Sequence, residues 1–142
     1  MNTPMSDETV RTVGLTRTVL GRYEATNVRG GKLSINGHDD FTPVELLLAA
    51  IASCSAADVD HITSKRSDPD HFEVTMTGDK VRDDSGNHMT NLRLVFDIGF
   101  PDDEGGTQAQ AVLPRAVAQT HDRLCTVSRT VELGSAIDIE VK

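Results

Sequence analysis

Two cysteines are the residues of this 142-residue chain whose types point most directly to chemistry. Cys54 lies among small residues, at positions 52–57, where a substrate or another backbone could approach closely. Cys125 follows 71 positions later. Free cysteine is among the most buried residue types, so each could be inert. If the fold brings the two sulfurs together, they could form a catalytic redox couple in which one thiolate reacts and a disulfide closes.

A reactive cysteine needs a positive partner, because the thiolate is the nucleophile and an apolar site raises the thiol pKa. Arg22, which follows a glycine in the amino-terminal segment, is one candidate. Glu45 could orient such an arginine through a bidentate pair, or it could interact with the positive amino end of a helix. The other candidate cations are Arg29, Arg17 and the two arginines that flank Cys125, namely Arg123 and Arg129.

His121 and Cys125 stand four residues apart, which on a helix would place both on one face and suggests half of a metal site. A structural zinc site needs four ligands, usually in closely spaced pairs, and the other histidines are scattered. The sequence also lacks the HExxH, glycine-rich phosphate-loop and GxSxG motifs. We therefore expect no bound metal or cofactor, with a His121/Cys125 site as an alternative.

The composition disfavours a partner with a phosphate backbone or an anionic lipid surface. There are 22 acidic and 14 basic residues, which gives a formal charge of −8. The sign of that charge argues against nucleic acid and against membranes. The most apolar run, residues 46–57, is shorter than the roughly 20 residues needed to span a bilayer and predicts a buried helix instead. Residues 1–10 lack the pattern of a signal peptide, which predicts a cytoplasmic protein.

The length fits one average domain. We predict a flexible arm at residues 1–9 and a single domain at residues 10–142. Alternating and β-branched residues between positions 10 and 36 predict short antiparallel strands, with hairpin loops at residues 27–31 and 36–40. Thr42 and Pro43 predict the start of a helix that runs to about Lys65. Its first half is apolar all round, so it must be covered on every side.

The second half of the chain predicts a hairpin, a helix and a closing strand pair. Residues 72–78 and 92–100 alternate with period two around a turn at residues 83–87. Residues 107–124 have nearly helical spacing, although Pro114 lies inside and the helix could begin there. Residues 127–133 and 137–141 predict two final strands.

Two stretches together resemble the OsmC/Ohr family. Residues 42–54 read T-P-V-E-L-L-L-A-A-I-A-S-C, which is similar to the central helix of that family, and residues 124–128 read L-C-T-V-S, which resembles its second cysteine motif. The order of predicted strands and helices fits along nearly the whole chain. The resemblance implies an α+β fold and an intertwined homodimer in which antiparallel sheets wrap two long central helices, with two active sites at the interface.

The resemblance also implies a thiol peroxidase. Cys54 matches the cysteine that a hydroperoxide oxidises to sulfenic acid, and Cys125 matches the cysteine that resolves it as a disulfide. An external thiol or dithiol, of the lipoyl type or a small thiol, would reset the pair, and the aliphatic surroundings of Cys54 favour organic hydroperoxides. Arg22 is the best match to the activating arginine of the family.

One departure from the family pattern concerns the glutamate of the central helix. Organic-hydroperoxide members carry it ten residues before the cysteine, where this chain has Val44; Glu45 is nine before. A one-residue shift turns a helical side chain by about 100°. The departure motivates an alternative function, in which the protein binds a small hydrophobic or thiol-reactive ligand at the dimer interface without catalysis.

Overall fold

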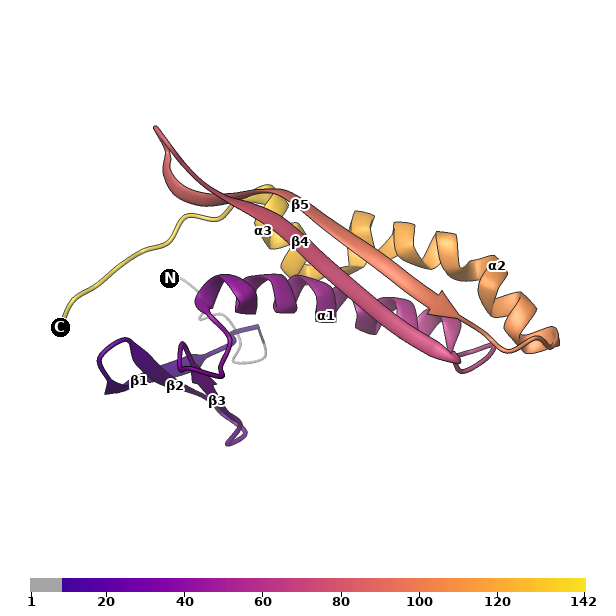
Figure 1. The fold of residues 1–142 in the computed structure, drawn as a ribbon, viewed down its shortest axis with the longest axis horizontal. Helices are drawn as coiled ribbons and strands as arrows, with labels where there is room; N and C mark the ends of the chain where they lie inside the picture. Colours follow the sequence, from indigo (N-terminus) through magenta and orange to yellow (C-terminus); the bar gives the residue numbers. More distant parts are fainter. Residues whose placement is uncertain (1–8) are drawn as a thin grey trace, which may run out of the picture. The chain divides into compact units, whose positions relative to one another are not determined.

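The computed structural model describes residues 9–142, and their contacts divide the chain into two compact units, residues 1–46 and 47–142. Figure 1 labels the elements of both. The predicted arm at residues 1–9 lies outside the described residues except for Thr9, and the single domain over residues 10–142 stays a prediction. Each unit is described by itself below.

The first unit contains a three-stranded antiparallel sheet in the order β1–β2–β3, formed by Val13–Val19, Arg22–Asn27 and Lys32–Ile35. The predicted short strands are confirmed, and so is the turn at residues 27–31, where the Asn27 side chain accepts hydrogen bonds from the N–H groups of Arg29 and Gly31. The predicted hairpin loop at residues 36–40 is wrong. That segment leads from β3 to the next helix, because Phe41 bridges back to Ile35 and no further strand follows.

Helix α1 runs over Pro43–Thr63, two residues shorter than predicted. A reciprocal capping pair fixes its start: the Thr42 N–H donates to Glu45 Oε1 at 2.8 Å, and the Glu45 N–H donates to Thr42 Oγ1 at 3.2 Å. By length and composition α1 could cross a bilayer, a test that the core helix of a soluble protein also passes.

The burial of α1 differs from the prediction. Its buried residues recur every fourth position and define one face, formed by Ile51, Ser55, Val59 and Thr63. The expectation that this chain covers the helix on every side is wrong, since Leu47 is 37% exposed and Leu46 only partly buried. A single hairpin and the following helices pack against one side of a cylinder and leave the other open.

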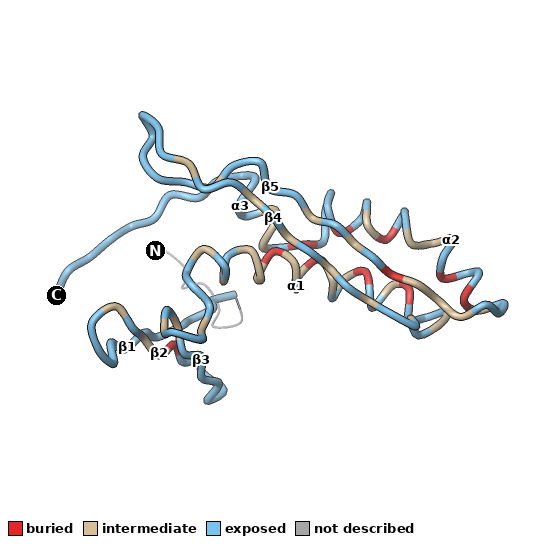
Figure 2. The backbone as a smooth tube through the Cα atoms, in the orientation of Figure 1, coloured by how far each residue is buried: buried red, intermediate tan, exposed pale blue. Residues whose placement is uncertain are grey.

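The predicted β-hairpin is confirmed and is longer than expected. Strands β4 (His71–Asp83) and β5 (Gly86–Gly99) pair antiparallel around a two-residue turn, and Gly86 adopts a φ of 96° there. Figure 2 shows the buried positions along α1, the end of β5 and the next helix. The core of this unit contains Val59, Ile98 and Ala116, against which Phe72 and Phe96 pack.

Helix α2 (Glu104–Gln119) begins ten residues before Pro114, so the alternative start at Pro114 is wrong. Asp103 caps it, because its Oδ1 accepts a hydrogen bond of 2.7 Å from the Gly106 N–H. A strong cap at the preceding aspartate thus outweighs the interior proline. A π-helical segment, η1 (Thr120–Leu124), continues from α2 to Cys125.

The predicted closing strands are also wrong. Residues 126–133 form helix α3 (Thr126–Leu133), which Cys125 caps at the start and Gly134, with a φ of 70°, ends. The β-branched residues favoured a strand, but the cap and the terminal glycine decide the local structure. Residues 134–142 have no regular structure, since a strand needs a partner and this segment pairs with none within the described chain. The α+β class with antiparallel sheets is confirmed.

Candidate functional site

The two cysteines meet within the second unit. Cys54 is partly buried in the middle of α1, Cys125 is fully buried, and both are free thiols. Their side chains are close enough for each thiol to shift the pKa of the other. The fold therefore brings together two sulfurs that are 71 positions apart in the sequence. A reversible disulfide would require two neighbouring thiols of this kind.

The π-helical segment η1 places Cys125 at this position. The Cys125 N–H donates to the Thr120 carbonyl at 3.0 Å, a bond that spans five residues, and the backbone then turns to an extended conformation at φ −73° and ψ 100°. This turn makes Cys125 the cap of α3, and the Ser128 N–H donates to its sulfur at 3.4 Å. Short π-helical segments inside helices occur frequently at functional sites.

Two further side chains join α1 to this segment. The Ser55 hydroxyl donates to the sulfur of Cys125 at 3.3 Å, and the Thr120 hydroxyl donates to Asp58 Oδ2 at 2.8 Å. Sequence reasoning missed Ser55, Asp58, Thr120 and Ser128 as site residues. The available signals were local: Ser55 and Asp58 lie one residue and one helical turn after Cys54, and Ser128 closes the second cysteine motif.

The two thiols differ in acidity. Burial raises the pKa of the Cys54 thiol above its ordinary value, and its contact with Cys125 and the Asp58 carboxylate raise it further, although the Val127 N–H acts in the opposite direction. Burial also acts to raise the pKa of Cys125, but hydrogen bonds from Ser128 and Ser55, together with the neighbouring Cys54 side chain, outweigh it and leave that pKa below its ordinary value. Cys125 is thus the more acidic of the two thiols.

Arg22 and Glu45 belong to the first unit. Arg22 is exposed at the first position of β2, and among residues 9–142 its guanidinium has no ion-pair partner. Glu45 is engaged in the capping pair with Thr42, and the hydrogen bond from the Thr42 N–H lowers the pKa of this carboxyl below its ordinary value. The helix-terminus role of Glu45 is therefore seen directly, whereas its pairing with an arginine and that of Arg22 with the thiolate stay predictions.

The alternative metal site at His121 and Cys125 gains no support from the geometry. His121 faces Asp122 at 3.0 Å and Glu132 at 3.4 Å, while the Cys125 sulfur is bound by Ser55 and Ser128. Across the described part of the chain, no cluster of three or more His, Cys, Asp or Glu side chains is arranged to hold a metal ion.

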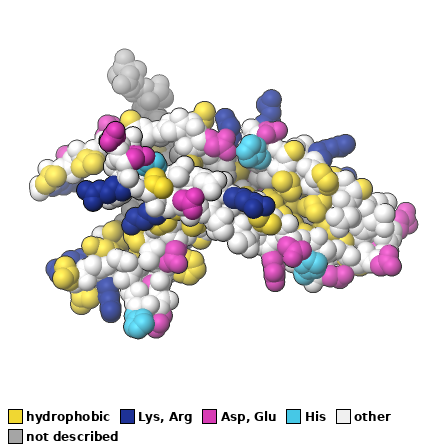
Figure 3. All heavy atoms as spheres, turned by 45° about the horizontal axis from the view of Figure 1, so that its top comes forward, with side chains coloured by type: hydrophobic (Ala, Val, Ile, Leu, Met, Phe, Trp, Pro, Cys, Tyr) yellow, Lys and Arg dark blue, Asp and Glu magenta, His cyan; other side chains and the backbone are white. Residues whose placement is uncertain are grey.

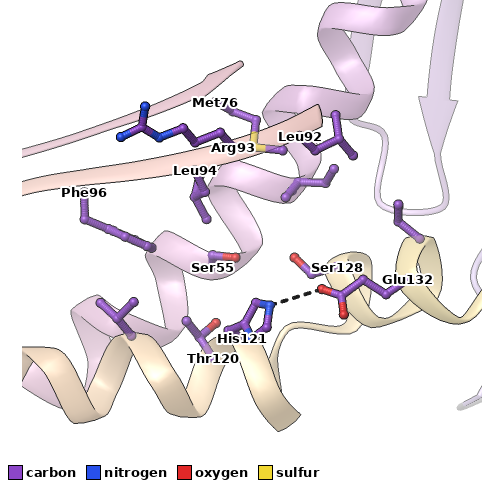
Figure 4. A pocket seen from close by; sticks show the side chains of 13 residues that line it. Ser55, Met76, Leu92, Arg93, Leu94, Phe96, Thr120, His121, Ser128 and Glu132 are labelled. Carbon is purple, nitrogen blue, oxygen red and sulfur yellow. Dashed lines mark ion pairs between the residues drawn. The ribbon is translucent and has the colours of Figure 1, made fainter. Parts of the chain in front are cut away.

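A cavity of about 450 Å³ lies beside the cysteine pair within the second unit. Ser55 and Ser128, the two residues that donate to the Cys125 sulfur, form part of its wall (Figure 4). Arg93 also belongs to the lining, but its guanidinium extends away from the other labelled side chains in that view. The apolar lining consists of Ile51, Met76, Leu92, Leu94, Phe96, Val117 and Val131, and the rest is Thr120, His121 and Glu132.

The size and lining of this cavity suit a small molecule with an apolar body. Its volume is within the usual range of ligand pockets, and most of its side chains are apolar. Four of the polar lining residues, Thr120, His121, Ser128 and Glu132, come from η1 and α3, where His121 and Glu132 form an ion pair (Figure 4). Neither cysteine lines the cavity, so Ser55 and Ser128 separate it from the sulfurs.

Comparisons with known proteins agree with this fold. A family model described as OsmC-like protein matches residues 36–142. An uncharacterized protein of Mycobacterium tuberculosis is 29% identical over 129 residues, which cover 88% of this chain and 91% of that protein. The match to the family model spans both the central helix and the second cysteine motif.

Two solved structures show the same fold. An OsmC-like protein of unknown function from Vibrio cholerae superposes with a TM-score of 0.72 at 16% identity, over 87% of this chain and 94% of that one. An organic hydroperoxide resistance protein, OhrB of Bacillus subtilis, gives a TM-score of 0.52 at 16% identity, over 85% and 90%. At these identities the likeness concerns the fold.

Proposed function

Because the chain belongs to the OsmC-like family, we propose that it is a thiol-dependent peroxidase that reduces hydroperoxides. The observation that carries the proposal is the contact between Cys54 and Cys125, two free thiols from distant parts of the sequence. A similar fold occurs in a protein named for organic hydroperoxide resistance.

The reaction divides into two chemical steps. In the first, the Cys54 thiolate attacks the terminal oxygen of the hydroperoxide; a sulfur–oxygen bond forms, the oxygen–oxygen bond breaks, and the alkoxide leaves as the alcohol after taking a proton. Cys54 is then a sulfenic acid. In the second, the Cys125 thiolate attacks the Cys54 sulfur, a disulfide forms, and hydroxide leaves as water. An external dithiol, for example of the lipoyl type, reduces the disulfide by thiol exchange and is itself oxidised.

Activation of Cys54 requires a cation that residues 47–142 do not place on it. Burial and Asp58 hold the pKa of this thiol above its ordinary value, and the causes of the shift within the described residues include no arginine. We assign the role to Arg22, with Arg29 as the second choice, because the resemblance to the family points to that strand. Glu45 could orient this arginine only with the part of its carboxylate that Thr42 leaves free.

The cavity supports an organic rather than an inorganic hydroperoxide. An alkyl or aryl tail gains about 25 cal/mol for each Å² of apolar surface that it buries, whereas hydrogen peroxide gains nothing of this kind. The apolar side chains of α1, β4, β5 and α2 offer such a surface beside the sulfurs.

We further propose that the protein acts as a cytoplasmic homodimer. Figure 3 shows hydrophobic side chains open at the surface between charged ones. Among the exposed hydrophobic residues of the described chain are Leu47 on the uncovered face of α1 and the alternating residues Ile137, Ile139 and Val141, which are 83%, 86% and 90% exposed. A second copy that covers this face and pairs with this segment would remove both from water. Light scattering in solution, which gives the particle mass, tests the dimer.

The function is tested by mapping the thiols after one equivalent of cumene hydroperoxide. Reduced protein is quenched with a thiol-blocking reagent at successive times, and the cysteines are identified by intact and peptide mass. We expect rapid loss of both thiols, a Cys54–Cys125 disulfide and one cumyl alcohol per chain. Cys54→Ser abolishes all three, and Ser53→Ala, at an exposed neighbouring position, abolishes none. Two thiols still free after minutes would refute the proposal.

The cavity also favours a second function, the binding of a small apolar ligand without catalysis. Decanoate added to the protein would then shift the methyl resonances of Ile51, Leu94 and Val117 at saturable concentrations, and Cys54→Ser would bind it equally well. Binding combined with an ordinary, slowly reacting Cys54 thiol selects this function over peroxidase activity. Unchanged methyl resonances would exclude decanoate from the cavity.

A further inference from the structure

Ser55 stands out among the serines of α1 by what its hydroxyl does. It is 2% exposed and donates to the sulfur of Cys125, which is fully buried. Ser53, two residues earlier, is exposed and donates to the Ala50 carbonyl of its own helix, the usual habit of a serine in a helix. A buried hydroxyl is costly unless it is paired, so an alanine would pack at position 55 with less penalty. The Ser55 hydroxyl is therefore explained by its hydrogen bond to the Cys125 sulfur.

The Cys125 sulfur also accepts a hydrogen bond from a second donor. The Ser128 N–H donates to its sulfur at 3.4 Å from the first turn of α3, where backbone N–H groups have no helical partner. The neighbouring Cys54 side chain lowers the pKa of Cys125 as well. A sulfur surrounded by donors is favoured as an anion.

None of the charged side chains described below forms an ion pair with the Cys125 sulfur. On α1, Asp58 is held by Thr120. On η1 and α3, His121 and Arg129 both pair with Glu132, at 3.4 and 3.6 Å. Arg93 of β5 extends away from the cavity side chains (Figure 4). The charge on the sulfur thus depends on hydrogen bonds and not on a direct ion pair.

We propose that Ser55 is a positioning residue that holds the Cys125 sulfur as a thiolate directed at Cys54, and so controls disulfide closure rather than the first attack on the hydroperoxide. The inference on closure rests on the proposed function. The lowered pKa of Cys125 and the raised pKa of Cys54 agree with it. In the step concerned, the Cys125 thiolate forms a bond to the Cys54 sulfenic sulfur, the sulfur–oxygen bond breaks, and hydroxide leaves and becomes water.

The test compares Ser55→Ala with Ser53→Ala in two measurements. In a Cys54→Ser background, the ultraviolet absorbance of the thiolate is titrated with pH, and we expect Ser55→Ala to raise the midpoint by about one unit, because one hydrogen bond to a charged group is lost. Ser53→Ala should leave it unchanged. In the full cysteine pair, Ser55→Ala should slow disulfide closure about tenfold at neutral pH, the same loss expressed as a rate. The rate of disulfide closure should fall further than the rate of alcohol release in the first turnover, because the hydrogen bond that is lost acts on Cys125.

The outcomes separate the inference from the function on which it rests. An unchanged midpoint in Ser55→Ala overturns the inference even if the protein is an active peroxidase. A raised midpoint in a protein that never consumes hydroperoxide keeps the role of Ser55 at the sulfur and refutes the peroxidase. If Ser55→Ala does not fold, titration of Cys54→Ser against Cys125→Ser decides: Cys125 must ionise at lower pH than Cys54, and the reverse order overturns the inference.

Discussion

Cys54 and Cys125 are neighbours in the fold, but their backbone positions differ: one lies inside a helix and the other at the start of one. Cys54 lies in the middle of α1, where the N–H groups of its own helix are already bonded to carbonyls one turn earlier. Cys125 caps α3, whose first-turn N–H groups are free to donate to a sulfur. The start of α3 supplies Ser128 to Cys125 and Val127 to Cys54. The position of a cysteine along a helix thus decides how many backbone N–H groups can stabilise its thiolate.

This difference suggests a division of work between the two sulfurs. Cys125 is stabilised as a thiolate inside the second unit itself, which suits a resolving cysteine that must react as soon as a sulfenic acid appears. The same surroundings raise the pKa of Cys54, so its own attack depends on a cation that stabilises the thiolate. The protein would then reach its reactive state only when that cation is in place.

Of the variants considered, Cys125→Ser should have the largest effect, because it separates attack by Cys54 from disulfide closure. In Cys125→Ser the first turnover still releases one alcohol per chain, because Cys54 performs the attack and loses a contact that raises its pKa. No disulfide forms, so repeated turnover with a dithiol that acts on the disulfide ceases. A dimedone adduct at Cys54, found by peptide mass, would identify the trapped sulfenic acid, and excess peroxide should convert it to the sulfinic acid.

The matched comparison for that experiment is Cys54→Ser, which leaves the more acidic thiol alone in the protein. We expect no alcohol release from this variant. Alcohol release from Cys54→Ser, with an adduct at Cys125, would reverse the roles assigned to the two cysteines.

A substitution at Asp58 should have a smaller effect, confined to the acidity of Cys54. Its carboxylate raises the pKa of Cys54, so Asp58→Asn should lower the pH midpoint of Cys54 alkylation by about half a unit and speed the first step up to threefold at neutral pH. An asparagine oxygen can still accept the bond from Thr120, which preserves the link to η1. Alkylation followed by peptide mass at a series of pH values provides the measurement.

Asp60→Asn is the control for that variant, because Asp60 is exposed on the same helix and does not contribute to the shift at Cys54. Equal shifts in the two variants would mean that overall charge, and not the Asp58 carboxylate, sets the acidity of Cys54.

The residues that could be predicted from the sequence are those whose signal is local or whose chemistry is unusual. Thr42, Pro43 and Glu45 predict the start of α1, and the two cysteines carry the family motifs. Ser55 and Ser128 could not be singled out, because a serine gains its role only when the fold brings a sulfur to it. The strand expected at residues 127–133 is a helix, since a cap formed by a cysteine is not an expected start signal.

The smallest expected effect concerns Glu45, whose two possible roles predict different results. If it only caps α1, Glu45→Gln keeps an oxygen that accepts from the Thr42 N–H and leaves peroxide turnover unchanged. If it also orients the activating arginine, turnover falls while the fold stays intact. Stability provides the check on the first role. The pKa of Glu45 is lowered in the folded protein, so its contribution is complete above the unfolded pKa of about 4.3 and is lost as the pH falls through the lower folded value. Thermal melts from neutral to acidic pH should therefore show a stability difference between parent and Glu45→Gln that shrinks only in that acidic range. A difference that persists at full size below it would mean that the carboxylate charge does not contribute to the cap.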